Sequence, residues 1–480
     1  MVWEIVMGLE VHVELNTKTK IFCSCTTAFG GEPNTHCCPV CTGQPGSLPV
    51  LNKQVLEYAV KTGIALNCDI TRYNKFDRKN YFYPDLPKAY QISQLYLPFA
   101  RDGKVHITTA SGKEKDIRIH EIHMEEDAGK LVHSPFGDVS YPDYNRCGVP
   151  LLEIVSEPDF RSSEEVIAYL IKLKSTLKYL GVSDCKMEEG SMRADVNLSV
   201  REAGSETFGT RTEMKNINSF KAIERAIAFE AQRQIDALEF GETIVQETRR
   251  WDDNRSKTYS MRSKENAQDY RYFPEPDIPP VAIDDVMMQR LTEAQPEMAE
   301  AKQKRYMRDY GMSEKTAKLL TEEKHFAEIF EQTAALSGKP EETANWLIGH
   351  TIYLMGLHKI DAEDVAIVPE IFAKFVKMMA SGKVNRTMGK ELFEQVFEGD
   401  PAFDIEAYVQ EHHMESIEDD GMIEQVVQAV LGEHEDLVQQ YKAGNEKVYG
   451  FFIGQCMRRL QGKADPALVN KLVKEEIAHR

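Results

Sequence analysis

Acidic side chains and a histidine alternate with apolar residues near the amino terminus. Between Ile5 and Leu15 every odd position is apolar, whereas the even positions include Glu10, His12 and Glu14. Because successive side chains of a strand point to opposite faces, this spacing predicts a strand with one core face and one face that presents Glu, His and Glu in a row. An ordinary strand with a solvated outer face has the same pattern, so this run alone leaves both interpretations open.

Two further runs combine a strand pattern with carboxylates. The even positions of Met192–Val200 are apolar, and the odd positions include Asp195. The run Val149–Val155 is apolar except for Glu153. An ionised carboxylate in an apolar strand is unfavourable unless it is paired or binds a metal. We therefore expect both runs to be strands that carry functional carboxylates.

A fourth strand-like run, Ile117–Asp127, is the richest in polar residues. Its apolar phase slips between Ile119 and Ile122, as a β-bulge would make it do. It carries four candidate ligands, which are Glu121, His123, Glu125 and Glu126. Carboxylates and a histidine on neighbouring strands suit Mg²⁺, which takes oxygen ligands and bridges to substrate phosphates. The alternative is a set of surface carboxylates that never converge.

A nucleotide site in this chain cannot be a P-loop, because no G-x-x-x-x-G-K-[ST] sequence occurs. Phosphates would have to be held by carboxylate-bound metal and by scattered basic residues. Arg78 and Lys79, beside three aromatic residues, are one candidate pair. Lys215 and Asn216 are the other, in a polar stretch that also contains Glu213.

Five of the nine cysteines lie between Cys23 and Cys41. Cys23-x-Cys25 and Cys38-Pro-Val-Cys41 are separated by twelve residues, a spacing that predicts a tetrahedral four-cysteine zinc site. Four thiolates leave no open position, so such a zinc would be structural. Cys37 is adjacent and could compete with Cys38, and unligated reduced thiols are the alternative interpretation.

The composition is that of a soluble globular protein with more than one domain. The chain has 480 residues, of which 42% are hydrophobic and 28% charged. It has no long uncharged apolar run and no export signal at its start, so we expect no membrane span and a cytoplasmic location.

The net charge of −19 argues against broad, non-specific nucleic-acid binding. Residues 442–480 nevertheless carry eight basic and four acidic side chains. Any RNA contact should therefore be local, and these last residues are one place to expect it.

The pattern along the chain predicts an α+β protein. About the first 290 residues alternate between strand-like and loop-like stretches, up to the proline-rich segment Pro274–Pro280. Beyond Asp284 apolar residues recur at helical spacing, and Gly399–Pro401 is a second break. We therefore predict domains over residues 1–292, 293–402 and 403–480.

Six long motifs in the first 280 residues and two in the tail are more specific than any of these patterns. They begin at Gly8, Phe76, His123, Pro150, Lys186, Asp269, Tyr449 and Gly462. Among them are Gly8-Leu-Glu-Val-His-Val-Glu-Leu15 and Phe76-Asp-Arg-Lys-Asn-Tyr-Phe-Tyr-Pro-Asp85. The chain resembles, over essentially its whole length, the family of aspartyl/glutamyl-tRNA(Asn/Gln) amidotransferase B subunits (GatB), of the zinc-containing bacterial type.

The resemblance implies a β-sheet cradle domain like that of glutamine synthetase, which contains the zinc knuckle at residues 23–41. An all-α helical domain and a small helical YqeY-like tail that contacts tRNA would follow. The implied catalytic residues are Lys79, Glu126, Glu153 and Asp195. The implied Mg²⁺ ligands are His12, Glu10, Glu125, Glu126, Glu153 and Asp195. The resemblance implies Lys79 as a phosphate or channel-mouth residue. With the polar stretches described above, the candidate nucleotide-binding residues are Arg78, Lys79, Lys215 and Asn216, and the spacing gives Cys23, Cys25, Cys38 and Cys41 as the zinc ligands.

The resemblance also implies an ATP- and Mg²⁺-dependent reaction. The side-chain carboxyl of mischarged Glu-tRNA(Gln) or Asp-tRNA(Asn) would be phosphorylated and then amidated. Ammonia would come from an amidase A subunit, and a small C subunit would brace the heterotrimer. The sequence agrees, because it contains neither a Gly/Ser-rich amidase stretch nor a cysteine nucleophile motif.

Two other functions stay open at this point. A non-catalytic tRNA-binding scaffold would tolerate changes at Asp195 or Glu153. A free-standing ATP-dependent ligase for a small carboxylic acid would work without tRNA or an amidase partner.

Overall fold

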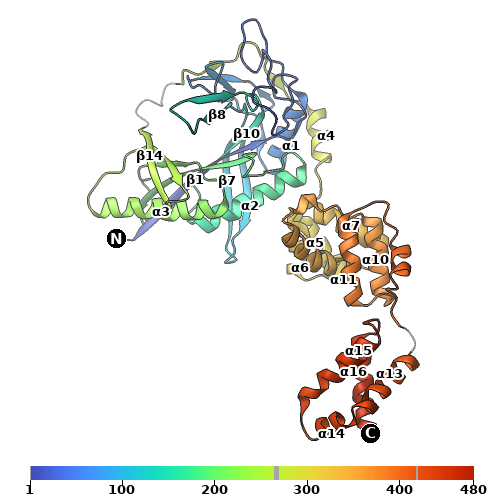
Figure 1. Cartoon of the computed structure of the whole chain (residues 1–480). Coiled ribbons are helices and arrows are strands. Elements are labelled where there is room, and N and C mark those ends of the chain that lie inside the picture. Colours follow the sequence, from blue (N-terminus) through green and yellow to red (C-terminus); the bar gives the residue numbers. More distant parts are fainter. Residues whose placement is uncertain (1, 264–269, 418–419) are drawn as a thin grey trace. The chain divides into compact units, whose positions relative to one another are not determined.

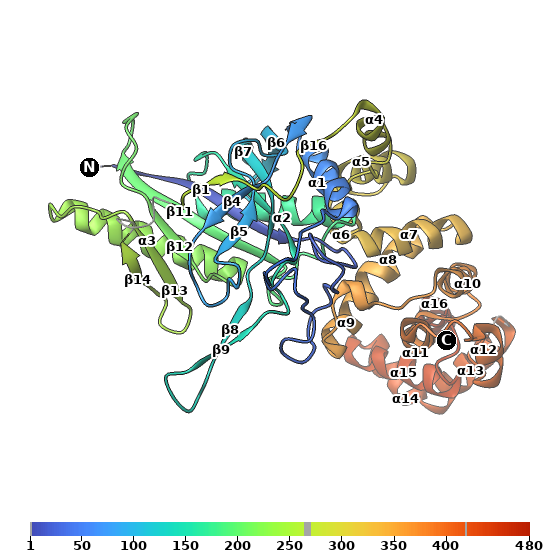
Figure 2. The same cartoon turned by 90° about the horizontal axis from the view of Figure 1, so that it is seen from above.

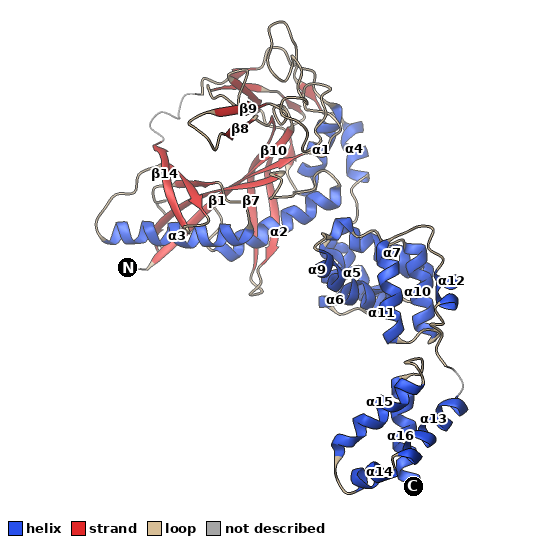
Figure 3. Cartoon of the chain, viewed as in Figure 1, coloured by secondary structure: helices blue, strands red, loops and turns tan. Residues whose placement is uncertain are grey.

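The computed structural model describes residues 2–263, 270–417 and 420–480. The chain divides into two compact units, Met1–Met298 and Ala299–Arg480. Within the described residues every strand belongs to the first unit, and the second unit contains only helices and loops (Figure 3). The structure is therefore of mixed α and β type, with the strands and the long helical run segregated along the sequence.

A nine-stranded sheet dominates the first unit, in the order β14-β13-β12-β11-β1-β10-β7-β6-β2. Neighbouring strands are antiparallel except β12 and β13, which are parallel. The strands are β1 (Trp3–Glu14), β2 (Asp69–Ile70), β6 (Ala100–Thr108), β7 (Glu114–Glu126), β10 (Pro150–Ser156), β11 (Met192–Glu202), β12 (Thr212–Lys215), β13 (Glu247–Asp252) and β14 (Lys257–Ser263).

β1 lies in the middle of this sheet and has the two faces that its alternation predicts. Met7, Leu9, Val11 and Val13 are buried in the core, which leaves the intervening polar side chains on the opposite face. The predicted bulge is also present. Val155 of β10 pairs with Glu121, but the next β10 residue pairs with Ile119, so one residue of β7 is skipped.

Three helices of the first unit were not expected from the strand-like and loop-like patterns. They are α1 (Lys53–Ala65), α2 (Ser163–Leu180) and α3 (Phe220–Glu239). Figure 1 shows α2 and α3 lying along one face of the large sheet, where α2 packs on β6 and α3 packs on β11. The apolar side chains of helices and sheet share one hydrophobic core. The helices thus cover the core face and leave the other face of the sheet for polar residues.

Smaller sheets lie across that other face. Their strands are β3 (Tyr73–Asn74), β4 (Asp77–Asn80), β5 (Tyr90–Ser93), β15 (Phe273–Pro274) and β16 (Val281–Ala282), and a separate hairpin is formed by β8 (Lys130–His133) and β9 (Ser140–Asp143). Figure 2 shows β4 and β5 over the middle of the large sheet and the β8–β9 hairpin projecting from it. The unit ends with α4 (Asp285–Glu293).

The second unit has two hydrophobic cores, one within residues 306–414 and one within residues 423–477. Its helices are α5 (Ala299–Tyr310), α6 (Glu314–Glu322), α7 (Lys324–Ser337), α8 (Pro340–Trp346), the π-helix η2 (Leu347–Thr351), α9 (Ile352–His358), the short 3₁₀ helix η3 (Ala362–Asp364), α10 (Pro369–Ser381), α11 (Arg386–Glu398), α12 (Ile405–Glu411), α13 (Asp420–Glu433), α14 (Glu435–Lys442), the 3₁₀ helix η4 (Glu446–Val448), α15 (Tyr449–Arg459) and α16 (Pro466–His479). Among the residues described, no helix has the length and apolar character needed to cross a membrane.

Candidate active site and metal centres

The polar face of the large sheet brings residues from five strands together. His12 of β1 lies opposite Glu153 of β10, and Glu153 lies opposite His123 of β7. On the other side of β1, Glu10 lies opposite Asp195 of β11. The pairing register of the strands therefore fixes the positions of these side chains, which do not lie on loops.

We call His12, Glu125 and Glu153 the first carboxylate group. One possible ligand atom of each residue lies within 4.8 Å of the other two. The His12 Nε2 and Glu125 Oε1 atoms are 3.8 Å apart, and the His123 Nδ1 atom is 3.7 Å from Glu153 Oε2. An imidazole and two carboxylates at this spacing can bind one divalent cation.

The second carboxylate group consists of Glu10, Asp195 and Glu213, whose ligand atoms also lie within 4.8 Å of one another. Lys215 forms ion pairs with Asp195 and, at 3.2 Å, with Glu213. The Asn197 side-chain amide donates a hydrogen bond of 2.8 Å to Glu10. The Thr248 hydroxyl also donates to Glu213 at 2.8 Å. Each carboxylate oxygen has more than one acceptor position, so three carboxylates at this spacing can also bind a cation.

The titration of these residues reflects their crowding. Burial, helped by the charge of Glu153, raises the pKa of Glu125 to about 7. Burial also acts to raise the pKa of Glu153, but His12, His123 and Lys79 outweigh it and hold that pKa at about 2. Burial, Glu153 and Glu213 raise the pKa of Glu10. A bound cation would relieve this repulsion between carboxylates, so the donor set fits Mg²⁺.

One pocket of about 260 Å³ is lined by His12 and Glu125 of the first carboxylate group, by Asp195 of the second and, across from the sheet, by Lys79 and Tyr81. β4 carries Lys79 to this position, where its ammonium lies 5.0 Å from the centre of the Tyr270 ring. Burial alone would lower the pKa of Lys79, but Glu153 and Glu125 raise it overall. Lys79 is therefore a charged ammonium that faces the carboxylates.

Three of the site residues named from the sequence lie elsewhere. The Arg78 guanidinium is held by Glu275, at 2.6 and 3.0 Å, and by Asp277 at 3.0 Å. Glu126 pairs with Lys88 and accepts a hydrogen bond from the Ile92 backbone, so it belongs to neither carboxylate group. Neighbouring residues of a strand point to opposite faces, which separates Arg78 from Lys79 and Glu126 from Glu125.

Asn216 has a positive φ of 64° in the turn after β12, and its side-chain amide donates to the Trp251 carbonyl. It therefore shapes the turn that follows Lys215. The second carboxylate group also contains one residue that the sequence pattern did not mark as a ligand. Glu213 completes the second carboxylate group, but its strand is only four residues long, too short for alternation to indicate a face.

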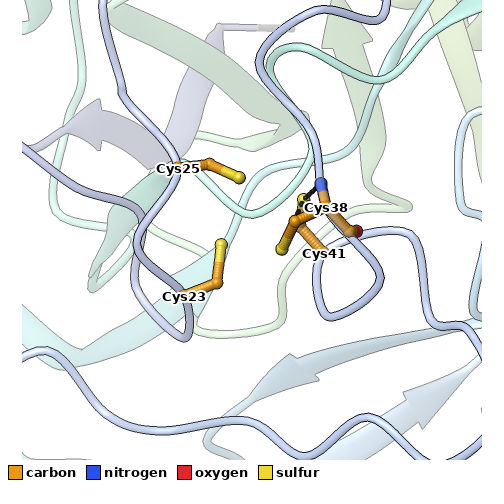
Figure 4. A group of neighbouring side chains, drawn as sticks. All are labelled: Cys23, Cys25, Cys38 and Cys41. Atoms are coloured by element: carbon orange, nitrogen blue, oxygen red, sulfur yellow. Dashed lines mark hydrogen bonds between the residues drawn. The ribbon is translucent and has the colours of Figure 1, made fainter.

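The four cysteines form a separate group in the loop after β1. Figure 4 shows the Cys23 and Cys25 side chains on one segment facing those of Cys38 and Cys41 on another. All four sulfur atoms lie within 4.8 Å of one another, and those of Cys38 and Cys41 are 4.0 Å apart. Tetrahedral zinc with Zn–S bonds of about 2.3 Å needs sulfur atoms about 3.8 Å apart, so this group fits zinc.

The surroundings of the cysteine group favour a thiolate at Cys41, whereas burial raises the pKa of Cys25 to about 11. The Cys41 sulfur accepts a hydrogen bond from the Cys38 backbone N–H at 3.2 Å and from the Lys20 ammonium at 3.7 Å. The Cys23 thiol, together with these two donors, lowers the pKa of Cys41. Cys37 is turned away, and its thiol donates to the Asn34 carbonyl at 3.1 Å. The structure thus brings Cys38, and not Cys37, into the group.

Comparisons with known proteins agree with this architecture. Residues 5–289 match the GatB/GatE catalytic domain, and residues 328–477 match the GatB domain. The chain is 58% identical to the B subunit of the aspartyl/glutamyl-tRNA(Asn/Gln) amidotransferase of Agathobacter rectalis, over 98% of this chain and 99% of that protein. It is 56% identical to the protein of the same name from Lachnoclostridium phytofermentans, over 99% and 98%.

The chain belongs to the GatB family. The catalytic-domain match contains both carboxylate groups and the four cysteines, which lie between Glu10 and Glu213. In this GatB chain the two candidate cation sites therefore belong to the part matched to a catalytic domain, and the second unit carries neither of them.

Proposed function

We propose that this GatB chain uses ATP to phosphorylate the side-chain carboxyl of mischarged Glu-tRNA(Gln) or Asp-tRNA(Asn), and that ammonia then displaces the phosphate. One observation carries the proposal: His12 and Glu125 of the first carboxylate group, Asp195 of the second and the Lys79 ammonium line a single pocket over a rigid sheet. The names of the relatives supply the substrate class.

A carboxylate is a poor electrophile, because attack adds charge to an anion and must expel oxide. Transfer of the γ-phosphoryl group from ATP to a carboxyl oxygen gives ADP and an acyl phosphate. Ammonia then attacks the carbonyl carbon, the C–N bond forms, the C–O bond to phosphate breaks, and a proton leaves the nitrogen. Phosphoryl transfer depends mainly on positioning and charge neutralisation, which a pocket of fixed charges provides.

The two carboxylate groups and the two lysines have different proposed roles, which follow from their positions. The first carboxylate group would hold one Mg²⁺, and the second, which includes Asp195, would hold another. Mg²⁺ bound there would neutralise phosphate charge and orient the phosphate chain. Lys79 lines the pocket and Lys215 pairs with Asp195 and Glu213, so both ammonium groups can contact phosphate or carboxyl oxygens.

A second pocket, of about 240 Å³, adjoins the Glu10 end of the carboxylates and suits the nucleoside. Gly8, Ser199 and Phe208 line it, together with Arg211. Gly8 places no side chain in this pocket, beside the backbone of residues 156–158, and Phe208 exposes 58% of its surface. A flat base resting on the strand with its phosphates directed to Glu10 would use both features. We infer that ATP spans the two pockets.

The fold and the partners complete the proposal. The first unit would serve as a cradle domain like that of glutamine synthetase, residues 293–402 as a helical domain, and residues 403–480 as a YqeY-like domain that contacts tRNA. Because the relatives are named as B subunits, we propose that an amidase A subunit supplies ammonia and that a small C subunit completes a cytoplasmic heterotrimer. Zinc would fasten the loop after β1.

The proposal is tested by measuring ADP formation by the complete complex with ammonium chloride as the source of ammonia. We expect ADP to form with Glu-tRNA(Gln) or Asp-tRNA(Asn) and to fall at least tenfold with the correctly charged Gln-tRNA(Gln), which has no carboxyl to activate. ADP formation that is indifferent to the esterified amino acid would contradict the proposal. Amide formation without ATP would contradict it as well.

A further inference from the structure

A groove in the second unit has the features of a binding site that the proposed chemistry does not use. We propose that it binds one unstacked nucleotide of the tRNA substrate, with its base on an aromatic floor and its phosphate on two cationic side chains. The groove has a volume of about 540 Å³ and lies between the helical segment 345–353 and α11. The inference rests on the proposed function, because tRNA is taken as the ligand.

The aromatic floor of the groove is carried by a helical segment that contains a π-helical turn. α8 continues into the π-helix η2 and then into α9 without leaving the helical conformation. Such π-turns are rare and frequently occur at functional sites. Gly349 lies in this turn, where an added Cβ would meet nothing within 4 Å. The Nε2 atom of His350 is buried and has no hydrogen-bond partner in the part of the chain that the structure describes.

Three aromatic rings of this helical segment form the floor of the groove. The His350 ring stacks on Tyr353 with a centroid distance of 5.6 Å and an interplanar angle of 21°. Trp346 meets His350 edge to face at 5.7 Å. Tyr353 exposes 59% of its surface, although a ring of this size is usually covered. An exposed ring that extends an aromatic array is the surface on which nucleic-acid bases stack.

The opposite wall supplies charge. Arg386, Lys390 and Glu394 lie on successive turns of α11, and all three are exposed. Neither Arg386 nor Lys390 forms an ion pair with any of the described residues. Exposed cations that line a groove together with aromatic rings match the phosphate and the base of a nucleotide. Burial and Lys390 lower the pKa of His350, which keeps its ring neutral.

The same features select among ligands. An acidic peptide would use the cations but would leave the aromatic floor uncovered. Paired RNA keeps its bases inside the helix, whereas a loop or bulge nucleotide can present both a base face and a phosphate. Asn345 and Glu394 at the edges of the groove can hydrogen-bond to the rim of the base. An unpaired tRNA nucleotide therefore fits the groove.

The test compares heterotrimers that carry Arg386→Glu/Lys390→Glu with a control, Lys374→Glu/Lys377→Glu, which makes the same charge change on exposed positions of α10. KM and kcat are measured for Glu-tRNA(Gln), and Kd is measured by filter binding at several salt concentrations. We expect the groove variant to raise KM and Kd at least tenfold with kcat within about twofold. Its salt slope should fall by about one to two units, and the control should match wild type.

A second pair of variants tests the aromatic floor without changing any charge, and its result does not depend on whether the charge-reversal variant folds. Tyr353→Ala should weaken tRNA binding about tenfold by removing a stacking surface, whereas Tyr353→Phe should bind like wild type. Wild-type affinity in both the charge variant and Tyr353→Ala would overturn the inference. It would also be overturned if these variants lost assembly of the heterotrimer while retaining tRNA affinity, because the groove would then hold a partner protein.

A result that overturns the groove inference can be distinguished from one that overturns the proposed function. If the groove variants bind tRNA normally in an enzyme that still forms amide from ATP, the inference alone is overturned. If wild-type enzyme forms ADP regardless of the esterified amino acid, the proposed function fails whatever the groove binds.

Discussion

Asp195→Asn is expected to reduce ATP-dependent amide formation by about 10²–10³-fold. Asp195 belongs to the second carboxylate group, pairs with Lys215 and borders the pocket that contains Lys79. Asparagine keeps the shape of the side chain but removes one negative charge from the proposed cation site, so the phosphates of ATP lose their neutralising partner. The rate is measured with Glu-tRNA(Gln), ATP and ammonium chloride, which bypasses the proposed amidase partner.

The matched control is Asp116→Asn on β7. Asp116 lies on the same sheet but pairs with Lys104 at 3.1 Å and His106 at 2.8 Å at its exposed end. We expect this variant to keep its rate within about twofold of wild type. Glutaminase activity should be unchanged in both variants. Normal amide formation by Asp195→Asn would remove the carboxylate groups from the mechanism and favour a tRNA-binding scaffold.

Cys38→Ser is expected to abolish zinc binding and to lower the melting temperature of the complex by about 10 °C. Between the end of β1 and the start of α1 the chain forms almost no regular secondary structure. The four thiolates therefore hold this loop together with hydrogen bonds to other segments, such as those from the Asn34 and His36 backbones to Asp143 and Asn145. Losing one ligand leaves the remaining thiolates without a tetrahedral site. Zinc content is measured by elemental analysis of the purified complex, and melting is measured by calorimetry.

Cys37→Ser is the matched control for this experiment, because Cys37 is adjacent in sequence but its thiol contacts the Asn34 carbonyl. We expect it to retain about one zinc per chain and a melting temperature within about 2 °C of wild type. Loss of zinc from Cys37→Ser, with zinc retained in Cys38→Ser, would mean that the ligands are the other way round. A wild-type complex without metal would contradict the zinc site altogether.

The alternation of side chains explains most of what could be predicted from the sequence. A strand with one buried face needs period-two patterning, so β1 was visible in the chain before its neighbours were known. The skipped residue in β7 was visible for the same reason, because a bulge reverses the apolar phase. Glu153 stood out because an isolated carboxylate in an apolar strand needs a partner, and His12 and His123 supply one.

The long helices of the first unit have sequence signals that the strand-like pattern does not include. The Ser162 side chain caps the first turn of α2 by accepting from the Glu165 backbone, and Gly181 ends the helix in the left-handed conformation. Both are helix signals that can be read from sequence, but the strand-like pattern elsewhere obscured them. α3 has a similar serine cap at Ser219.

Adjacent residues with the same chemistry were harder to assign. Glu125 and Glu126 are neighbours with the same functional group, and only the first points to the pocket. Arg78 and Lys79 differ in the same way, since Glu275 holds Arg78 on the other side of β4. A partner residue far away in the sequence decides which side chain is available, and no local pattern contains that information.

Transfer of oxygen-18 tests the central claim most directly. Glu-tRNA(Gln) labelled in both side-chain carboxyl oxygens is incubated with the complete complex, ATP and ammonium chloride, and the phosphate released is analysed by mass spectrometry. If the carboxyl is phosphorylated and ammonia displaces the phosphate, about one labelled oxygen should enter inorganic phosphate for each amide formed. Amide formation with unlabelled phosphate, or with the label in AMP, would contradict phosphorylation of the carboxyl by this GatB chain.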